Sequence, residues 1–168
     1  MKSISKYSII LLLLFMQHSC GIYSFSGTSI PPEVETFSVG FFENLASINS
    51  PLLSQTFTEK LKQKFISETN LSIVETEGDF KFTGDITNFV IAPVSAQSTD
   101  NAQLNRLTIT INVKLESEKN PKSDFEQSFN NFQDFDAAEN FNSVEDQLID
   151  EITDMLVQQV FNKAAINW

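Results

Sequence analysis

The chain has 168 residues, a normal size for one domain, and carries 11 basic against 22 acidic side chains, a net charge of −11 at pH 7. This charge disfavours nucleic-acid binding and excludes attachment to an anionic membrane through a basic patch. The only histidine, His18, and the only cysteine, Cys20, stand near the start of the chain. If this stretch is removed or modified, no His-based triad, cysteine nucleophile or typical zinc site is possible, so we expect no enzyme, no cofactor and no metal.

The N-terminal stretch has the pattern of an export signal. Two lysines precede an apolar run over residues 9–16, which is too short to span a membrane. Cys20 follows directly between small residues, as in a bacterial lipobox, and has no second cysteine to pair with. We predict a signal peptide at 1–19, acylation (palmitate) of Cys20 and a tether at 20–32. The alternative is an ordinary signal in which Cys20 is coincidental.

The first strand and the first helix follow the tether. Near-alternating apolar residues predict a strand over 33–42. Ser50 and Pro51 mark a helix start, because serine can cap free amides and proline in the first turn loses no hydrogen bond. Apolar residues at every fourth position then predict a helix over 51–69. Its positive charges are Lys60, Lys62 and Lys64. They form either a solvated helix face, which we prefer, or an anion-binding patch.

The middle of the chain predicts strands. Residues 71–91 alternate, with a bulge expected at Gly84, where the apolar phase shifts, and an end at Pro93. A polar loop at 94–103 follows. The clearest strand is 106–116, where apolar and polar residues alternate without a break. One side of this strand is therefore core, and the other meets solvent or a partner.

Residues 124–136 are ambiguous. Three phenylalanines have helical spacing, but the Asn130-Asn131 pair is a poor helix former. We prefer a strand with a bulge at the asparagine pair, and a helix is the alternative.

The last element is a helix with a continuous apolar stripe. Asn142 or Ser143 is predicted to cap it, and it is predicted to run to about residue 163. Glu145 and Asp146 would then lie in its first turn, where the helix dipole favours negative charge.

These elements predict one α/β (α+β) sandwich domain over 33–168: a mixed four- to five-stranded sheet with two helices packed on one face. Chemistry-bearing groups are scarce in it. Asp79 and Asp85 could bind a calcium ion, but no loop of alternating oxygen ligands surrounds them, so we prefer solvated carboxylates.

The order of elements and several short strings resemble a known family, the LptE-type lipopolysaccharide-assembly lipoproteins in their Bacteroidetes-like form. The resemblance covers nearly all of the chain after Cys20, although the lipobox is irregular. The matching strings are Cys20-Gly21 with Tyr23, Phe25 and Gly27, then 41–46 (FFENLA), 58–61 (TEKL), 78–80 (GDF) with Gly84 and Ile86, 106–109 (RLTI) and 161–168.

The resemblance implies an outer-membrane lipoprotein on the periplasmic side that plugs and helps assemble an LptD-type β-barrel and supports lipopolysaccharide transport to the outer leaflet. Its expected partners are the barrel, lipopolysaccharide and, through Cys20, the membrane. Possible lipopolysaccharide contacts are Lys60, Lys62, Lys64 and Arg106. The alternative is a lipid-anchored envelope binding module, such as an adhesin or glycan-binding subunit. The lack of acidic residues directly after Cys20 favours the periplasmic side. An enzyme of envelope turnover would lack catalytic groups.

Overall fold

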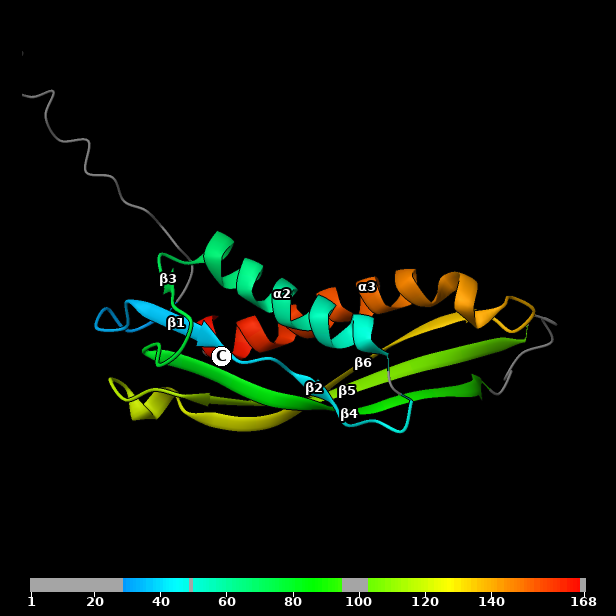
Figure 1. Ribbon diagram of the computed structural model, residues 1–168, viewed down its shortest axis with the longest axis horizontal. Helices are drawn as coiled ribbons and strands as arrows, with labels where there is room; N and C mark the ends of the chain where they lie inside the picture. Colours follow the sequence, from blue (N-terminus) through cyan, green and yellow to red (C-terminus); the bar gives the residue numbers. More distant parts are fainter. Residues whose placement is uncertain (1–28, 49, 95–102, 167–168) are drawn as a thin grey trace, which may run out of the picture.

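The structure, a computed structural model, describes residues 29–48, 50–94 and 103–166. Both helices lie on one face of a long twisted sheet, and the opposite face has no helix over it (Figure 1). The signal peptide predicted at 1–19, Cys20 and most of the tether lie outside the described residues.

The sheet is mixed. Its strands are β1 (Thr36–Val39), β2 (Glu43–Asn44), β3 (Ser72–Ile73), β4 (Phe80–Val94), β5 (Leu104–Glu116) and β6 (Phe125–Asp136). The order is β3-β1-β4-β5-β6, and β2 also pairs with β4, alongside the part of β4 that β1 does not reach. β1 is parallel to β3 and β4, whereas β4, β5 and β6 form an antiparallel meander. The predicted fold class is confirmed, and the two-residue strands β2 and β3 raise the number of strands to six.

The helices are α2 (Pro51–Glu68) and α3 (Phe141–Phe161); α3 continues into a π-helical turn at Asn162–Ile166, and a short 3-10 turn at Pro121–Ser123 precedes β6. The predicted start of α2 at Pro51 is confirmed. The predicted cap of α3 is wrong by two or three residues, because the cap is Asn140, whose side chain accepts a 3.0 Å hydrogen bond from the Asn142 amide, and the helix begins at Phe141. Glu145 and Asp146 therefore lie beyond the first turn, which holds no acidic residue.

Phenylalanine fills the space between the helices and the sheet. Phe65 of α2 is fully buried, and its ring centroid lies 5.5 Å from that of Phe37 in β1, 4.7 Å from Phe82 in β4 and 5.2 Å from Phe161 in α3. Tilted and edge-on ring pairs of this kind add to the free energy gained by burying their area. One aromatic side chain thus joins both helices to two strands.

The irregular points of the sheet differ from those expected. The β4–β5 register shifts between Ile86 and Asn88, so the bulge predicted at Gly84 is wrong in position. Gly84 has instead a left-handed φ of 154°, and a Cβ there would lie 2.0 Å from the carbonyl oxygen of Asn112. β4 also runs through Pro93 to Val94.

β6 is a strand, as preferred over the helical alternative, and each of its residues from Phe125 to Asp136 has a partner on β5. No register shift interrupts this pairing, so the bulge predicted at Asn130-Asn131 is wrong.

Candidate functional site

The side of the sheet opposite the helices, here called the open face, has no described helix over it. Along β5, Leu107, Ile109 and Ile111 are buried against the helices, while the residues between them point to the open face. This alternation follows from the two-residue period of a strand. The rows across β4, β5 and β6 read Thr83-Lys114-Glu126, Asp85-Asn112-Ser128, Asn88-Thr110-Asn130, Val90-Thr108-Phe132 and Ala92-Arg106-Asp134.

Charged pairs gather at the end of the open face next to β1. Lys81 Nζ lies 2.8 Å from Glu77 Oε1, and Lys114 Nζ lies 2.8 Å from Glu116 Oε1. The hydrogen bond from Lys114 lowers the pKa of the Glu116 carboxyl, and the bond to Glu77 raises the pKa of Lys81. Exposed pairs of this kind contribute little to folding, so they shape the polarity of the surface.

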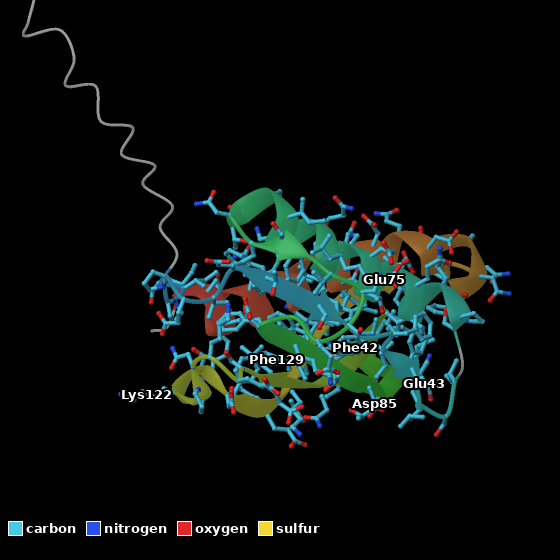
Figure 2. All side chains as sticks on the ribbon, turned by 60° about the vertical axis from the view of Figure 1, so that its left-hand side comes forward. Phe42, Glu43, Glu75, Asp85, Lys122 and Phe129 are labelled. Carbon is cyan, nitrogen blue, oxygen red and sulfur yellow. The ribbon has the colours of Figure 1, made fainter. Side chains whose placement is uncertain are left out.

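The side edge of the open face is acidic. Glu43 of β2 and Asp85 of β4 are register partners in a parallel pair, and both lie on the same side of the sheet. Figure 2 shows these two carboxylates close together, with Lys122 at the other end of the molecule. Like charges on directly opposite strand positions destabilise the pairing. This pair of carboxylates therefore does not stabilise the fold.

The far end of the open face has an aromatic and cationic cluster. Arg106 donates two hydrogen bonds to the Asp134 carboxylate, at 2.7 and 2.9 Å, and its guanidinium lies 3.7 Å from the centroid of the Phe132 ring. The Arg106 bond lowers the pKa of the Asp134 carboxyl. Phe132 and Val90 nevertheless remain 42% and 43% exposed. The open face thus changes from charged at one end to partly apolar at the other.

Asp79 fastens the start of β4 to the start of β1. Its Oδ2 accepts 2.9 Å hydrogen bonds from the amides of Glu35 and Thr36, and its Oδ1 lies 3.0 Å from Lys119 Nζ. The pKa of this carboxyl falls well below its ordinary value of 3.8, first because of the Glu35 amide and then because of Lys119 and Thr36. The role of Asp79 is therefore to hold two parallel strands in register.

The calcium reading of Asp79 and Asp85 finds no support in this geometry. The Asp79 carboxylate is already occupied by two amides and a lysine, and Asp85 lies six residues further along the chain, about 20 Å away in an extended strand. Among residues 29–48, 50–94 and 103–166, no group of three or more His, Cys, Asp or Glu side chains could hold a metal ion.

The four cations suggested for lipopolysaccharide do not form one site. Lys60 lies 2.6 Å from both Asp150 and Asp154 of α3, so it bridges the two helices. Lys62 pairs with Glu59 at 2.7 Å and Lys64 with Glu68 at 3.4 Å. Arg106 lies across the sheet from these lysines and pairs with Asp134. Each of these cations therefore has a carboxylate partner, which an anionic ligand would have to displace.

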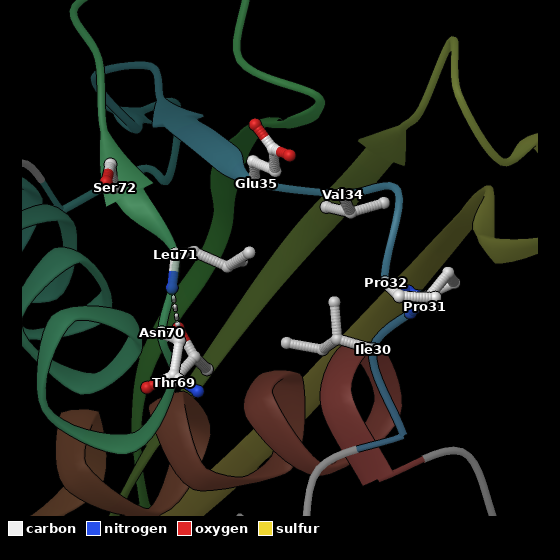
Figure 3. A pocket seen from close by; sticks show the side chains of 9 residues that line it. All are labelled: Ile30, Pro31, Pro32, Val34, Glu35, Thr69, Asn70, Leu71 and Ser72. Carbon is white, nitrogen blue, oxygen red and sulfur yellow. Dashed lines mark hydrogen bonds between the residues drawn. The ribbon is translucent and has the colours of Figure 1, made fainter.

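A cavity of about 400 Å³ lies where the first described residues meet the end of α2 (Figure 3). Its walls are mainly aliphatic or uncharged, with Ile30, Pro31 and Val34 on one side and Thr69 and Leu71 on the other. Glu35 is the only titratable residue that lines it. The cavity has no pair of groups that could perform acid–base or nucleophilic chemistry.

No described helix is long and apolar enough to span a membrane. A model of the LptE family, described as lipopolysaccharide-assembly, matches residues 34–164. A solved structure of a protein from Xanthomonas campestris is similar over 79% of this chain and 89% of that chain, with a TM-score of 0.52 and 14% identity, which shows the fold alone. A minor lipoprotein from Acinetobacter baumannii is 12% identical, with 78% and 92% covered and a TM-score of 0.49.

No curated protein matches the chain. The family model nevertheless spans nearly all of the described fold, from the residues just before β1 to the end of α3. The chain therefore belongs to the LptE family of lipopolysaccharide-assembly proteins.

Proposed function

We propose that this protein is the lipoprotein partner of an LptD-type outer-membrane β-barrel, inside which it acts as a plug and assembly factor while lipopolysaccharide passes to the outer leaflet. Membership of the LptE family supports a role in lipopolysaccharide assembly. The barrel as the partner, and the plugging itself, are the parts that we propose.

The observation that carries the proposal is the open face of the sheet. Most of its rows across β4, β5 and β6 consist of threonine, asparagine, serine and charged residues, with Val90 and Phe132 near one end, and no described helix covers them. The interior wall of a large outer-membrane barrel is polar. A polar, regularly spaced strand surface can exchange hydrogen bonds with such a wall without leaving buried polar groups unpaired.

Depletion of the protein tests the function as a whole. We expect the level of the correctly assembled barrel to fall and lipopolysaccharide to accumulate before it reaches the cell surface. Both are measured by immunoblotting and surface labelling during depletion. Normal barrel levels and normal surface lipopolysaccharide after full depletion would exclude this function and favour a lipid-anchored binding module.

A pair of tryptophan variants tests the role of the open face. Thr110 lies in the middle of this face, whereas Gln55 is exposed on α2. Thr110→Trp should reduce co-purification of the barrel from detergent-solubilised outer membrane, because the bulky ring prevents close approach of a wall. Gln55→Trp is the matched control and should co-purify normally. If both variants retain the barrel at the wild-type level, the open face does not contact it.

Lipid attachment at Cys20 is part of the same proposal. Cys20 lies outside the described residues, and the sequence pattern around it supports acylation. Cys20→Ala should abolish palmitate labelling and release protein from the membrane fraction. A Cys20→Ala protein that still takes up label would disprove this assignment.

Lipopolysaccharide contact through Lys60, Lys62, Lys64 or Arg106 is also a proposal. The ion pair between Arg106 and Asp134 lies on the open face, and the lysines lie on α2. Replacing each cation with glutamine, one at a time, and measuring lipopolysaccharide binding would show which side of the molecule participates, if either does.

A further inference from the structure

Within the described part of the chain, no strand pairs with the outer edge of β6, which is distinct from the open face. β6 is the last strand in the sheet order, and it pairs with β5 from Phe125 to Asp136. Beyond the strand, the Ala137 amide donates a 2.9 Å hydrogen bond to the Gln103 carbonyl. Because bonded and non-bonded pairs alternate in an antiparallel ladder, odd-numbered residues of β6 bond to β5. The even-numbered residues direct their N–H and C=O groups outward: Glu126, Ser128, Asn130, Phe132, Asp134 and Asp136.

This edge lacks most devices that proteins use to block strand addition. Short strands, lysine, proline and bulges usually protect a sheet edge. The opposite side of the sheet uses the first device, because β2 and β3 have two residues each. β6 has 12 residues, contains neither lysine nor proline, and pairs without a register shift. One outward amide, that of Phe132, is taken by the Asn131 side chain at 2.9 Å, which leaves the stretch before it available.

A groove runs beside this available stretch. It has a volume of about 450 Å³ and lies between residues 127–130 of β6 and the C-terminal part of α3. The helical side consists of Gln159 of α3 and of Asn162 and Lys163 in the π-helical turn that follows it. A strand added to β6 would place every second side chain in this groove. Extended peptides bind in this way, by adding a strand to an exposed sheet edge, in several families of binding domains. The amide side chains of the groove favour polar groups on that side of the added strand, and Lys163 disfavours basic ones there.

The charge of β6 indicates which kind of strand could be added to its edge. On the open-face side, β6 carries Glu126, Asp134 and Asp136 and no basic residue. Arg106 neutralises Asp134, whereas neither Glu126 nor Asp136 forms an ion pair with any described residue. A second copy of β6 would add acidic residues to an acidic row, and like charges across strands are unfavourable. A basic strand would complement both this row and the net charge of −11.

We propose that the outer edge of β6 binds an extended strand of a partner protein, with polar side chains toward α3 and lysine or arginine toward Glu126. The inference goes beyond the proposed function. A closed barrel has no free strand edge, so the added strand comes from a loop or terminal segment of whichever protein supplies it.

The test uses two peptides of the length of β6, 12 residues, added to the full chain in detergent micelles. In one peptide lysine alternates with threonine, and in the other glutamate alternates with threonine. Amide hydrogen exchange is followed at Ser128 and Asn130. At about ten times its Kd, the lysine peptide should slow exchange of these outward amides about tenfold, and the glutamate peptide should not.

Variants of the protein distinguish pairing of the peptide with the β6 edge from non-specific attraction of a basic peptide to an acidic protein. Asn130→Pro removes an outward donor and leaves the hydrogen bonds to β5 in place, so affinity for the lysine peptide should fall about five- to tenfold. Asn130→Thr is the matched control and should bind as the wild type does. Gln159→Trp fills the groove without altering β6 and should also weaken binding, which keeps the proposal testable if the proline variant does not fold.

Two results would overturn the inference. Binding of the lysine peptide without protection at Ser128 and Asn130 would reduce the interaction to non-specific attraction between opposite charges. Concentration-dependent self-association that protects the same two amides would make a second copy the occupant. Neither result bears on the barrel, which is tested by Thr110→Trp on the open face.

Discussion

The two faces of the sheet are made by the same strands and have opposite properties. On the helix side, Ile109, Ile111 and Val113 of β5 are fully buried, whereas Thr110 and Asn112 between them are partly accessible on the open face. Burial of apolar area on the first side supplies folding free energy, and the second side contributes little to it. The open face is therefore free to change for binding, while the helix side is constrained by packing.

The largest expected effect comes from deleting part of a buried side chain. Ile111→Ala should lower the free energy of unfolding by about 2–5 kcal/mol, because it leaves a cavity under the helices. Thr110→Ala, one residue away on the open face, should cost less than about 1 kcal/mol. Denaturant unfolding followed by circular dichroism measures both. Equal, small losses would mean that the two faces do not differ in packing.

A backbone change should have the next largest effect. Gly84→Ala should destabilise the fold by about 1–3 kcal/mol, because its φ of 154° is strained for alanine and the added Cβ would approach Asn112 and Phe42. Gly40→Ala is the control, since a Cβ there comes no closer than 3.5 Å to its neighbours. Thermal unfolding of the two variants compares them. A Gly84→Ala protein as stable as Gly40→Ala would show that β4 and β5 can separate locally without loss.

The hydrogen bonds of the Asp79 carboxylate to the start of β1 should stabilise the fold at neutral pH and lose this effect in acid. The pKa of its carboxyl is lowered in the folded state, so its stabilising contribution is present above the ordinary value of 3.8 and is lost as the pH falls below it. Asp79→Asn removes the charge and should flatten the fall of unfolding free energy with acidification below about pH 4. Urea unfolding at several pH values measures this. An unchanged acid profile in the variant would place the acid sensitivity elsewhere.

The smallest effect is expected at the exposed ring of the open face. Phe132→Thr should change the unfolding free energy by no more than about 0.5 kcal/mol, because the ring is 42% exposed and threonine suits a strand. Phe135→Thr, at a buried position three residues later, should cost several times more. Thermal unfolding of both variants checks the contrast. A large loss at Phe132 would show that its contact with Arg106 holds the sheet together.

Local patterns in the sequence predicted the parts of the fold that depend on local spacing. The alternation at 106–116 predicted both faces of β5, and the Ser50-Pro51 pair predicted the start of α2. The position of the β4 bulge could not be predicted in this way, because it depends on which residue of β5 lies opposite each residue of β4. The parallel pairing of β1 with β4 also left no local signature, since these segments are far apart in the chain.

The sequence predicted only part of the candidate surfaces. A polar side of the sheet was predicted from one strand. Strand register determines the ion pair of Arg106 with Asp134, and helix packing determines the bridging role of Lys60. Neither can be predicted from local sequence patterns. The contact of Phe132 with Arg106 was not predicted for the same reason, although the alternation within β6 indicated weakly that Phe132 lies on the open face.

The pairing of β1 with β4 also has a consequence for the order of folding. The meander β4–β5–β6 joins neighbouring segments, whereas β1 can pair with β4 only after the chain has passed through α2. Pairings between distant segments close large loops and form late. We expect Ile111→Ala to slow refolding and Phe37→Ala mainly to speed unfolding, as stopped-flow measurements would show. Until β4 is available, β1 can pair only with the two-residue strand β3, so Phe37, Val39 and Phe42 lack the β4 residues beside which they pack. Apolar side chains exposed in this way during synthesis favour aggregation.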